Sequence, residues 1–213
     1  PAYEYESKNL PYLIDLPKTR GYGQPIIVGG RLVITGDGYV ACLNKQDGKY
    51  LWYHSQILAE GVDDKLFGAD APAARELIKK IQTLDEQEVV QRNEKMPIDV
   101  IVNQRAELAK QIRVLEKKAD PKKIALIEAA WSQAESSWSV TPCSDGKAVY
   151  VWNQFGLATC YDMTGKRLWA TAIDYPGDTH HGFATMPVLT DGKFFVKQYQ
   201  LTAFDAKTGK VVW

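Results

Sequence analysis

The chain ends in Phe204-Asp205-Ala206-Lys207-Thr208-Gly209-Lys210-Val211-Val212-Trp213, and the Gly-Lys-x-x-Trp pattern that closes this stretch occurs twice more. The earlier copies are Gly48-Lys49-Tyr50-Leu51-Trp52 and Gly165-Lys166-Arg167-Leu168-Trp169. A proline precedes the three tryptophans by 27, 27 and 26 residues, and Trp169 and Trp213 lie 44 residues apart. A repeat of about 40–50 residues built from short strands is typical of a β-propeller.

Each repeat reads as four short strands separated by turns. In the third repeat we expect strands at 183–190, 193–198, 201–204 and from 210 onward. Asp191-Gly192 stands at one turn and the run 205–209 at another, where glycine supplies the positive φ that tight turns need. The sequence therefore predicts a mainly β fold: a partial β-propeller of about three four-stranded blades with an inserted α-helical hairpin.

The insertion separates the first repeat from the second. Over residues 55–134 the strand pattern is lost, and Ala, Glu, Lys, Gln and Leu dominate. Asp70-Ala71-Pro72 predicts a helix start, Met96-Pro97 predicts a break, and Asp120-Pro121 predicts the start of a third, shorter helix. We therefore divide the chain into a first blade with an N-terminal strand at 1–54, the coiled-coil-like insertion at 55–134, and the second and third blades at 135–213.

Apolar residues recur in the insertion at helical spacing, with Arg105 interrupting the seam of the second helix. They are Leu77, Ile81 and Leu84, then Ile98, Ile101, Leu108, Ile112 and Leu115, then Ile124, Ile127 and Trp131. This pattern predicts an antiparallel hairpin and a short helix leading back to the second blade. Two roles remain open: an arm that packs on its own propeller, or a protruding arm that binds a partner or dimerises.

The three repeated tryptophans have two possible roles, packing between blades or stacking on a ligand. A large ring near the outer edge of a blade fills the gap to its neighbour and removes apolar area from water. The sequence favours packing, so we assign structural docking to Trp52, Trp169 and Trp213 together with Gly48, Gly165 and Gly209.

Composition and charge exclude some functions. The 213 residues carry a formal net charge of zero, so the basic footprint of a nucleic-acid binder is missing. No run of 18 apolar residues predicts a transmembrane helix. The chain starts at Pro1 and stops inside a repeat, and a ring needs about four or more blades. We expect either a fragment of a longer protein or several chains that complete a ring together.

The cysteines favour packing over chemistry. Cys42 and Cys160 occupy similar third-strand positions in their repeats, which is typical of buried small hydrophobes. With Cys143 they make three, and the chain has three histidines and no Cys-x-x-Cys. The sequence therefore predicts no metal site.

A candidate ligand site lies at the expected mouth of the propeller channel. His180 and His181 precede the inner strand of the third repeat, with Asp178 nearby and Arg20 at a comparable place before the first. A paired histidine there can bind a metal, act as a base or contact an anionic ligand. Because no carboxylate motif accompanies the pair, an exposed loop with ordinary hydrogen bonds is the favoured interpretation.

At the repeated motifs the chain resembles the pyrroloquinoline quinone (PQQ)-like β-propeller repeat family. The stretch 204–213 resembles the tryptophan-docking motif of that family, residues 43–52 are a looser copy with Asn44 in place of the usual Asp, and 161–169 has a turn one residue shorter. The resemblance covers roughly residues 10–52 and 138–213.

The resemblance implies one of two activities. Some members are quinoprotein dehydrogenases that hold PQQ and calcium, typically with a disulfide between adjacent cysteines beside the quinone; others bind no cofactor and act as scaffolds. Cysteines are not adjacent here, and no motif places a catalytic residue or a calcium ligand set. The family also implies a periplasmic or secreted location.

Three functions follow as hypotheses. The first is a non-enzymatic binding or assembly scaffold, without a cofactor, that binds a protein partner or self-associates through the helical insertion. The alternative is a quinoprotein-like oxidoreductase that uses PQQ and calcium in a complete propeller. The third is carbohydrate or polyanion binding at the channel mouth through His180 and His181. The ligand, the total number of blades and the oligomeric state are not readable from the sequence.

Overall fold

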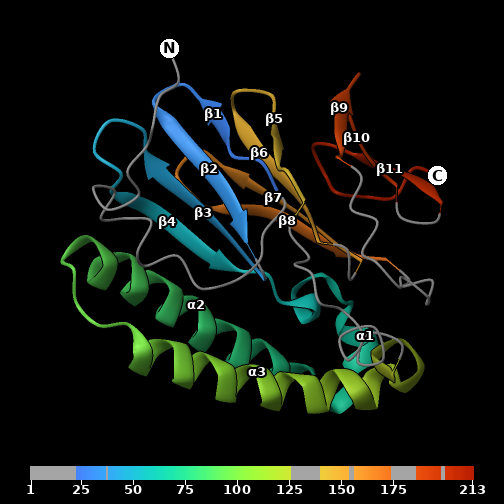
Figure 1. Ribbon diagram of the computed structural model, residues 1–213. Coiled ribbons are helices and arrows are strands. Elements are labelled where there is room, and N and C mark those ends of the chain that lie inside the picture. Colours follow the sequence, from blue (N-terminus) through green and yellow to red (C-terminus); the bar gives the residue numbers. More distant parts are fainter. Residues whose placement is uncertain (1–22, 37, 126–139, 154–155, 174–185, 198–199) are drawn as a thin grey trace.

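Three antiparallel sheets lie side by side, and a helical hairpin runs along the first of them (Figure 1). The structure is a computed structural model, and it describes residues 23–36, 38–125, 140–153, 156–173, 186–197 and 200–213. The predicted mainly β protein with an inserted helical hairpin is therefore observed. Its sheet arrangement is consistent with part of a propeller.

The first and second sheets each have four strands in sequence order, and the third has three strands ordered β11-β10-β9. The first sheet contains β1 (Ile26–Val28), β2 (Arg31–Gly36), β3 (Tyr39–Asn44) and β4 (Tyr50–Ser55). The second contains β5 (Cys143–Ser144), β6 (Ala148–Asn153), β7 (Leu157–Asp162) and β8 (Arg167–Ala172). The third contains β9 (Val188–Thr190), β10 (Lys193–Lys197) and β11 (Leu201–Asp205).

The third sheet differs from the prediction in its last strand. We expected a fourth strand from Lys210 onward, but within residues 200–213 the pairing is limited to a bridge between Phe204 and Val211. Hydrogen bonds from the Ala203 amide to the Trp213 carbonyl (2.8 Å) and from the Val212 amide to the Ala203 carbonyl (2.8 Å) extend this contact. The segment thus follows β11 without forming the full ladder seen for β4 and β8.

Apolar cores fill the spaces between neighbouring sheets. One core joins the first and second sheets through residues such as Val33, Val40 and Val149. Another joins the second and third sheets through Trp152, Phe194 and other buried residues. Central strands are buried on both faces, which explains why they read as continuous apolar runs rather than as alternating ones.

The insertion forms the predicted antiparallel hairpin. It begins with η2 (Leu58–Gly61), α1 (Asp64–Phe67) and η3 (Gly68–Asp70), and continues as α2 (Ala71–Asn93) and α3 (Asp99–Ala119). Pro72 lies in the first turn of α2, as predicted, and Pro97 lies between the two helices. Residues 121–125 are helical and begin the predicted third helix, whereas Ile127 and Trp131 lie outside the described residues.

The hairpin packs on its own first sheet. Figure 1 shows α2 between β4 and α3, and α2 contacts both of them. The seam between the helices contains the buried residues Ile78, Ile81 and Ile112. Val89 of α2 joins a second apolar cluster that includes Leu43 and Tyr53 of the first sheet. The structure therefore favours an arm fixed to the sheets over a free protruding arm.

Candidate functional site

Two of the repeated tryptophans connect neighbouring sheets by the same contact. Trp52 on β4 is buried, and its indole Nε1 donates to the Met163 carbonyl at 3.3 Å. Trp169 on β8 is likewise buried and donates to the Ala206 carbonyl at 2.9 Å. In both cases the indole reaches a turn of the next sheet, after β7 for Trp52 and after β11 for Trp169, so each ring combines apolar packing with a satisfied polar atom.

The glycine of each repeat makes room for these rings. A Cβ on Gly165 would lie 2.5 Å from Cγ of Trp52, and a Cβ on Gly209 would lie 2.5 Å from the ring of Trp169. Both glycines also have positive φ, 91° and 71°. Close approach and backbone conformation together require glycine at these positions.

A second contact ties the same turn to the preceding sheet. His54 Nε2 lies 2.6 Å from the Gly165 carbonyl, and the His54 ring stacks on Tyr161 with 4.7 Å between ring centroids. At the next junction the Thr171 hydroxyl donates to the Gly209 carbonyl at 2.8 Å. Burial lowers the pKa of His54, so its neutral form is favoured in this packed position.

The last tryptophan is exposed. Trp213 is 57% exposed, its ring centroid lies 5.9 Å from that of Phe195, and its docking role stays a prediction. Gly48 has the positive φ of its counterparts, 71°. The turn of Gly48 belongs to the first sheet, which has no preceding sheet in the described part of the chain.

The predicted ligand-mouth residues lie outside the described residues. These are His180, His181, Asp178 and Arg20. The hypothesis of a ligand site at the channel mouth therefore stays a prediction.

The hairpin is joined to the first sheet by hydrogen bonds to an edge strand. Asp85 on α2 accepts from the backbone amide and from the hydroxyl of Ser55, both at 2.7 Å. Asn93, two turns further along α2, accepts from the Tyr50 amide at 2.8 Å and donates to its carbonyl at 2.9 Å. Side chains of α2 thus satisfy backbone groups that β4 would otherwise present at the edge of the sheet.

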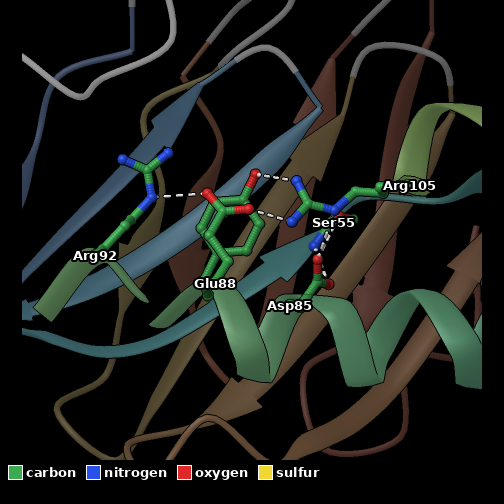
Figure 2. A network of polar contacts seen from close by, with 6 residues as sticks. Ser55, Asp85, Glu88, Arg92 and Arg105 are labelled. Carbon is green, nitrogen blue, oxygen red and sulfur yellow. Dashed lines mark hydrogen bonds and ion pairs between the residues drawn. The ribbon is translucent and has the colours of Figure 1, made fainter. Parts of the chain in front are cut away.

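Four charged side chains form a buried network at this junction (Figure 2). Arg105 of α3 pairs with Asp85 at 3.0 Å and also with Glu88, and Arg92 pairs with Glu88 at 2.7 Å. The side chains of Asp85 and Glu88 are only 2% and 1% exposed. Two carboxylates therefore meet two guanidinium groups, and the network is balanced in charge when all four groups are ionised.

Aromatic rings of β4 complete the environment of the two arginines. The guanidinium of Arg105 lies 5.0 Å from the Tyr53 ring centre, and that of Arg92 lies 5.2 Å from the Tyr50 ring centre. Cations over aromatic faces are stabilised, the more so when water is excluded. Burial raises the pKa of Asp85 to about 7, against the opposing attraction of Arg105. Burial thus disfavours the ionised form of Asp85, whereas Arg105 favours it.

Sequence reasoning missed this network, although a signal for it exists. Asp85, Glu88 and Arg92 are spaced by three and four residues and so share one stripe of α2. Arg105 stands inside an otherwise apolar seam. A charged residue in a seam, opposite a charged stripe on the neighbouring helix, indicates a buried ion-pair network.

The base of the hairpin is attached to the second sheet. Glu60 in η2 pairs with Arg167 of β8, and it accepts from Gln82 of α2 at 3.1 Å. Burial raises the pKa of Glu60, while Arg167 opposes the shift. A cavity of about 200 Å³ lies beside this contact, and its lining includes Leu58, Phe67, Glu116 and Ala172. The hairpin is therefore held at both ends by buried polar contacts.

The side of the hairpin groove away from these contacts is open. A groove of about 580 Å³ runs between the two helices, lined by Lys80, Thr83, Leu84, Asn103, Gln104, Glu107 and Leu108.

Within the described residues no helix is long and apolar enough to span a membrane. The described ranges also contain no group of three or more His, Cys, Asp or Glu side chains placed to hold a metal ion.

Comparison with known proteins supports the repeat assignment. Residues 122–213 match the family model described as outer membrane protein assembly factor BamB, of the PQQ-like repeats. The match covers the second and third repeats, and it agrees with the resemblance that their Gly-Lys-x-x-Trp motifs indicate. A search of curated proteins finds no match.

Several solved structures are similar to the chain. Quinohemoprotein alcohol dehydrogenase ADHIIG from Pseudomonas putida HK5 is 18% identical with a TM-score of 0.48, covering 93% of this chain and 21% of that one. The quinohemoprotein alcohol dehydrogenase from Comamonas testosteroni is 14% identical with a TM-score of 0.49, covering 92% and 21%. BamB from Moraxella catarrhalis is 13% identical with a TM-score of 0.45, covering 93% and 39%. The chain thus spans between a fifth and two fifths of the length of these structures.

Proposed function

We propose that the chain is part of a PQQ-like β-propeller that acts as a non-enzymatic binding or assembly scaffold, with the helical hairpin as its partner-binding element. One observation carries this proposal. Buried polar contacts fix the hairpin to the sheets on one side, while the groove on its other side is open. A rigid element that presents an open surface is suited to recognition, because little conformational freedom is lost on binding.

The network at the junction supports a fixed orientation of the hairpin. Hydrogen bonds and ion pairs require defined geometry, so Asp85, Asn93 and Arg105 favour one placement of the helices on β4. An arm that only needed to cover apolar surface would not require three buried charged residues and the partly buried Arg105. The hairpin is therefore presented as a rigid body together with the sheets.

The cysteines of the described residues do not support a quinone site. The cysteines are free: Cys42 and Cys160 are buried in the two cores between sheets, and Cys143 lies on β5. None of them has the adjacent partner that forms a disulfide beside the quinone in the resembling dehydrogenases. We accordingly derive no reaction step through PQQ, and the oxidoreductase remains the alternative.

The same proposal includes a periplasmic or secreted location and a closed ring of propeller blades. The description of the matching family model, outer membrane protein assembly, supports a periplasmic or secreted protein. The repeated docking of Trp52 and Trp169 supports the interpretation of the three sheets as successive blades of one propeller. The total number of blades in the ring is a property of the complete propeller, of which these three sheets are a part.

A titration separates the scaffold from the oxidoreductase. PQQ and calcium are added to the full-length protein, and quinone absorbance and dye-linked alcohol oxidation are followed. The scaffold predicts neither a spectral change nor turnover above a protein-free control. Saturable quinone binding with calcium-dependent turnover would instead establish the alternative.

A further inference from the structure

A cavity lies where the base of the hairpin meets the second sheet, at the end of the hairpin that contains α1 (Figure 1). We call it the base cavity; its volume is about 200 Å³, and its lining comes from η2, α1, the end of α3, residues 120–124 and β8. The walls touch one another directly. A Cβ on Gly61 of η2 would lie 2.5 Å from the Ala172 amide nitrogen, and Lys123 Nζ donates to the Ile173 carbonyl at 2.5 Å. The cavity is therefore preformed, as ligand pockets usually are.

Apolar side chains form most of the lining of the base cavity. Protein interiors contain few voids larger than a water molecule, and an apolar cavity of about 150 Å³ is sufficient to bind benzene. The base cavity therefore has room for an aromatic ring with a short substituent. Its apolar members are Leu58, Val62, Leu66, Phe67, Ala119, Ile124 and Ala172.

A buried carboxylate also lines the base cavity. The side chain of Glu116 is only 4% exposed, and its Oε2 lies 3.0 Å from Nη1 of Arg113 on the same helix. Glu116 also accepts a hydrogen bond from the Ala59 amide. A carboxylate offers about four acceptor positions, so these two partners leave acceptor capacity in an otherwise apolar wall. Burial raises the pKa of Glu116 while Arg113 opposes the shift, and a further cation beside the carboxylate would favour its ionised form.

The charges of the lining favour a cationic ligand over an anionic one. Three carboxyl groups, those of Asp63, Glu116 and Asp120, line the cavity together with one ammonium group, that of Lys123. Asp63 and Asp120 accept from nearby backbone amides at 2.8 and 2.9 Å, and the Lys123 ammonium is engaged by the Ile173 carbonyl. When Arg113 is included, carboxylates still outnumber cations by three to two. An anion would therefore meet net repulsion.

We propose that the base cavity binds a small primary amine, with the apolar body of the ligand against Phe67 and Ile124 and its ammonium group on Glu116. An ammonium group has three donors and no acceptor, which matches a buried carboxylate with acceptor capacity, and hydrogen bonds between charged groups are the stronger ones. This site goes beyond the proposed scaffold function. It lies on the side of the hairpin attached to the sheets, and its lining shares no residue with that of the groove between α2 and α3.

Isothermal titration calorimetry with benzylamine tests the proposal at about pH 7, where an alkylamine is protonated. Benzyl alcohol has the same ring and length without the charge, so it measures the apolar contribution alone. Saturable binding of benzylamine is expected, roughly tenfold tighter than that of benzyl alcohol. Glu116→Gln keeps the shape of the side chain and should weaken benzylamine binding roughly tenfold while leaving the alcohol within about twofold.

Two further variants locate the site. Glu107 is a matched control for Glu116, because it lies on α3 and pairs with Lys110 at the same spacing of three residues, but its side chain is 66% exposed. Glu107→Gln should leave the affinity for benzylamine unchanged. Ala119→Met retains Glu116 and fills part of the base cavity, so it should weaken binding of both ligands. Circular dichroism melting curves check that each variant folds, and Ala119→Met tests the site even where Glu116→Gln does not fold.

Several results would overturn the proposal. These are no binding of benzylamine, unchanged affinity for it in Glu116→Gln or Ala119→Met, and binding of benzyl alcohol as tight as that of benzylamine. Glu107 lines the groove between the helices, so a loss of benzylamine binding in Glu107→Gln alone would also overturn the proposal and assign the amine to that groove.

Discussion

Replacement of Gly165 by alanine should destabilise the junction between the first two sheets by more than backbone strain alone. Gly165 has φ of 91°, and a Cβ there would lie 2.5, 2.7 and 2.8 Å from Cγ, Cβ and Cδ1 of Trp52. An L-residue in a left-handed conformation costs about 1–2 kcal/mol. Overpacking of a filled core adds about 1–3 kcal/mol. We therefore expect a loss of about 2–5 kcal/mol in the free energy of unfolding.

Gly146 is the matched control for the backbone contribution. Its φ is 85°, close to that of Gly165, and a Cβ on Gly146 would meet no atom within 4 Å. Gly146→Ala should therefore cost only the strain of about 1–2 kcal/mol. The difference between the two variants measures the contact with Trp52.

Urea unfolding followed by circular dichroism measures both losses, provided that the slope of unfolding free energy against urea is unchanged between variants. In a Trp52→Ala background the excess cost of Gly165→Ala should shrink, because two of the three nearest atoms, Cγ and Cδ1, are then absent. Such coupling is the expected behaviour of residues in contact. Equal losses for Gly165→Ala and Gly146→Ala would refute the argument that Trp52 docks on this turn.

Three further predictions concern the hairpin junction and a buried thiol. Because the folded pKa of Asp85 lies near 7, above its usual 3.8, the stability that it contributes is full below about pH 4 and is lost as pH rises through 7; Asp85→Asn should flatten this decline in urea midpoints between about pH 4 and 7, and an unchanged pH profile would contradict it. Asn93→Ala removes two hydrogen bonds to the Tyr50 backbone, each worth about 0.5–1.5 kcal/mol, and should cost about 1–3 kcal/mol of unfolding free energy, whereas Asn103→Ala on the exposed side of α3 should cost little. Burial raises the pKa of Cys160 to about 12, so a chromogenic disulfide reagent at pH 8 should label it only as fast as the protein unfolds, and its modification in an initial burst by the native protein would argue against this burial.

Sequence periodicity predicts the elements of this fold well because local rules decide them. The Gly-Lys-x-x-Trp repeats place the starts of β4 and β8, and the two prolines at 72 and 97 mark the boundaries of the helices. The burial of Cys42 and Cys160 also follows from their equivalent places opposite Trp52 and Trp169.

The junction of hairpin and sheet is not predictable in the same way. Charged residues are normally assigned to the solvent, and Asn93 meets Tyr50 across 43 positions of the chain. Only the folded geometry brings the edge of β4 under α2.

Register shows which face of the first sheet the hairpin covers. Each sheet pairs one apolar residue of its second strand with one of its third: Leu32 with Leu43, Val149 with Tyr161, and Phe194 with Phe204. In the second and third sheets these pairs belong to the core shared with the preceding sheet. In the first sheet, Leu32 and Leu43 cluster with Tyr50, Tyr53 and Val89 of α2.

The hairpin therefore covers part of one face of the first sheet. In the second and third sheets the corresponding face is covered by the preceding sheet. At the junctions between sheets, Trp52 and Trp169 each make one indole hydrogen bond to the next sheet. At the junction with the hairpin, Asn93 and Asp85 of α2 accept hydrogen bonds from the backbone of the edge strand β4. The two roles that the sequence left open for the insertion are then compatible. The face of α2 toward β4 completes the packing of the first sheet, and because that packing fixes the helices, the opposite face is held in one orientation for recognition.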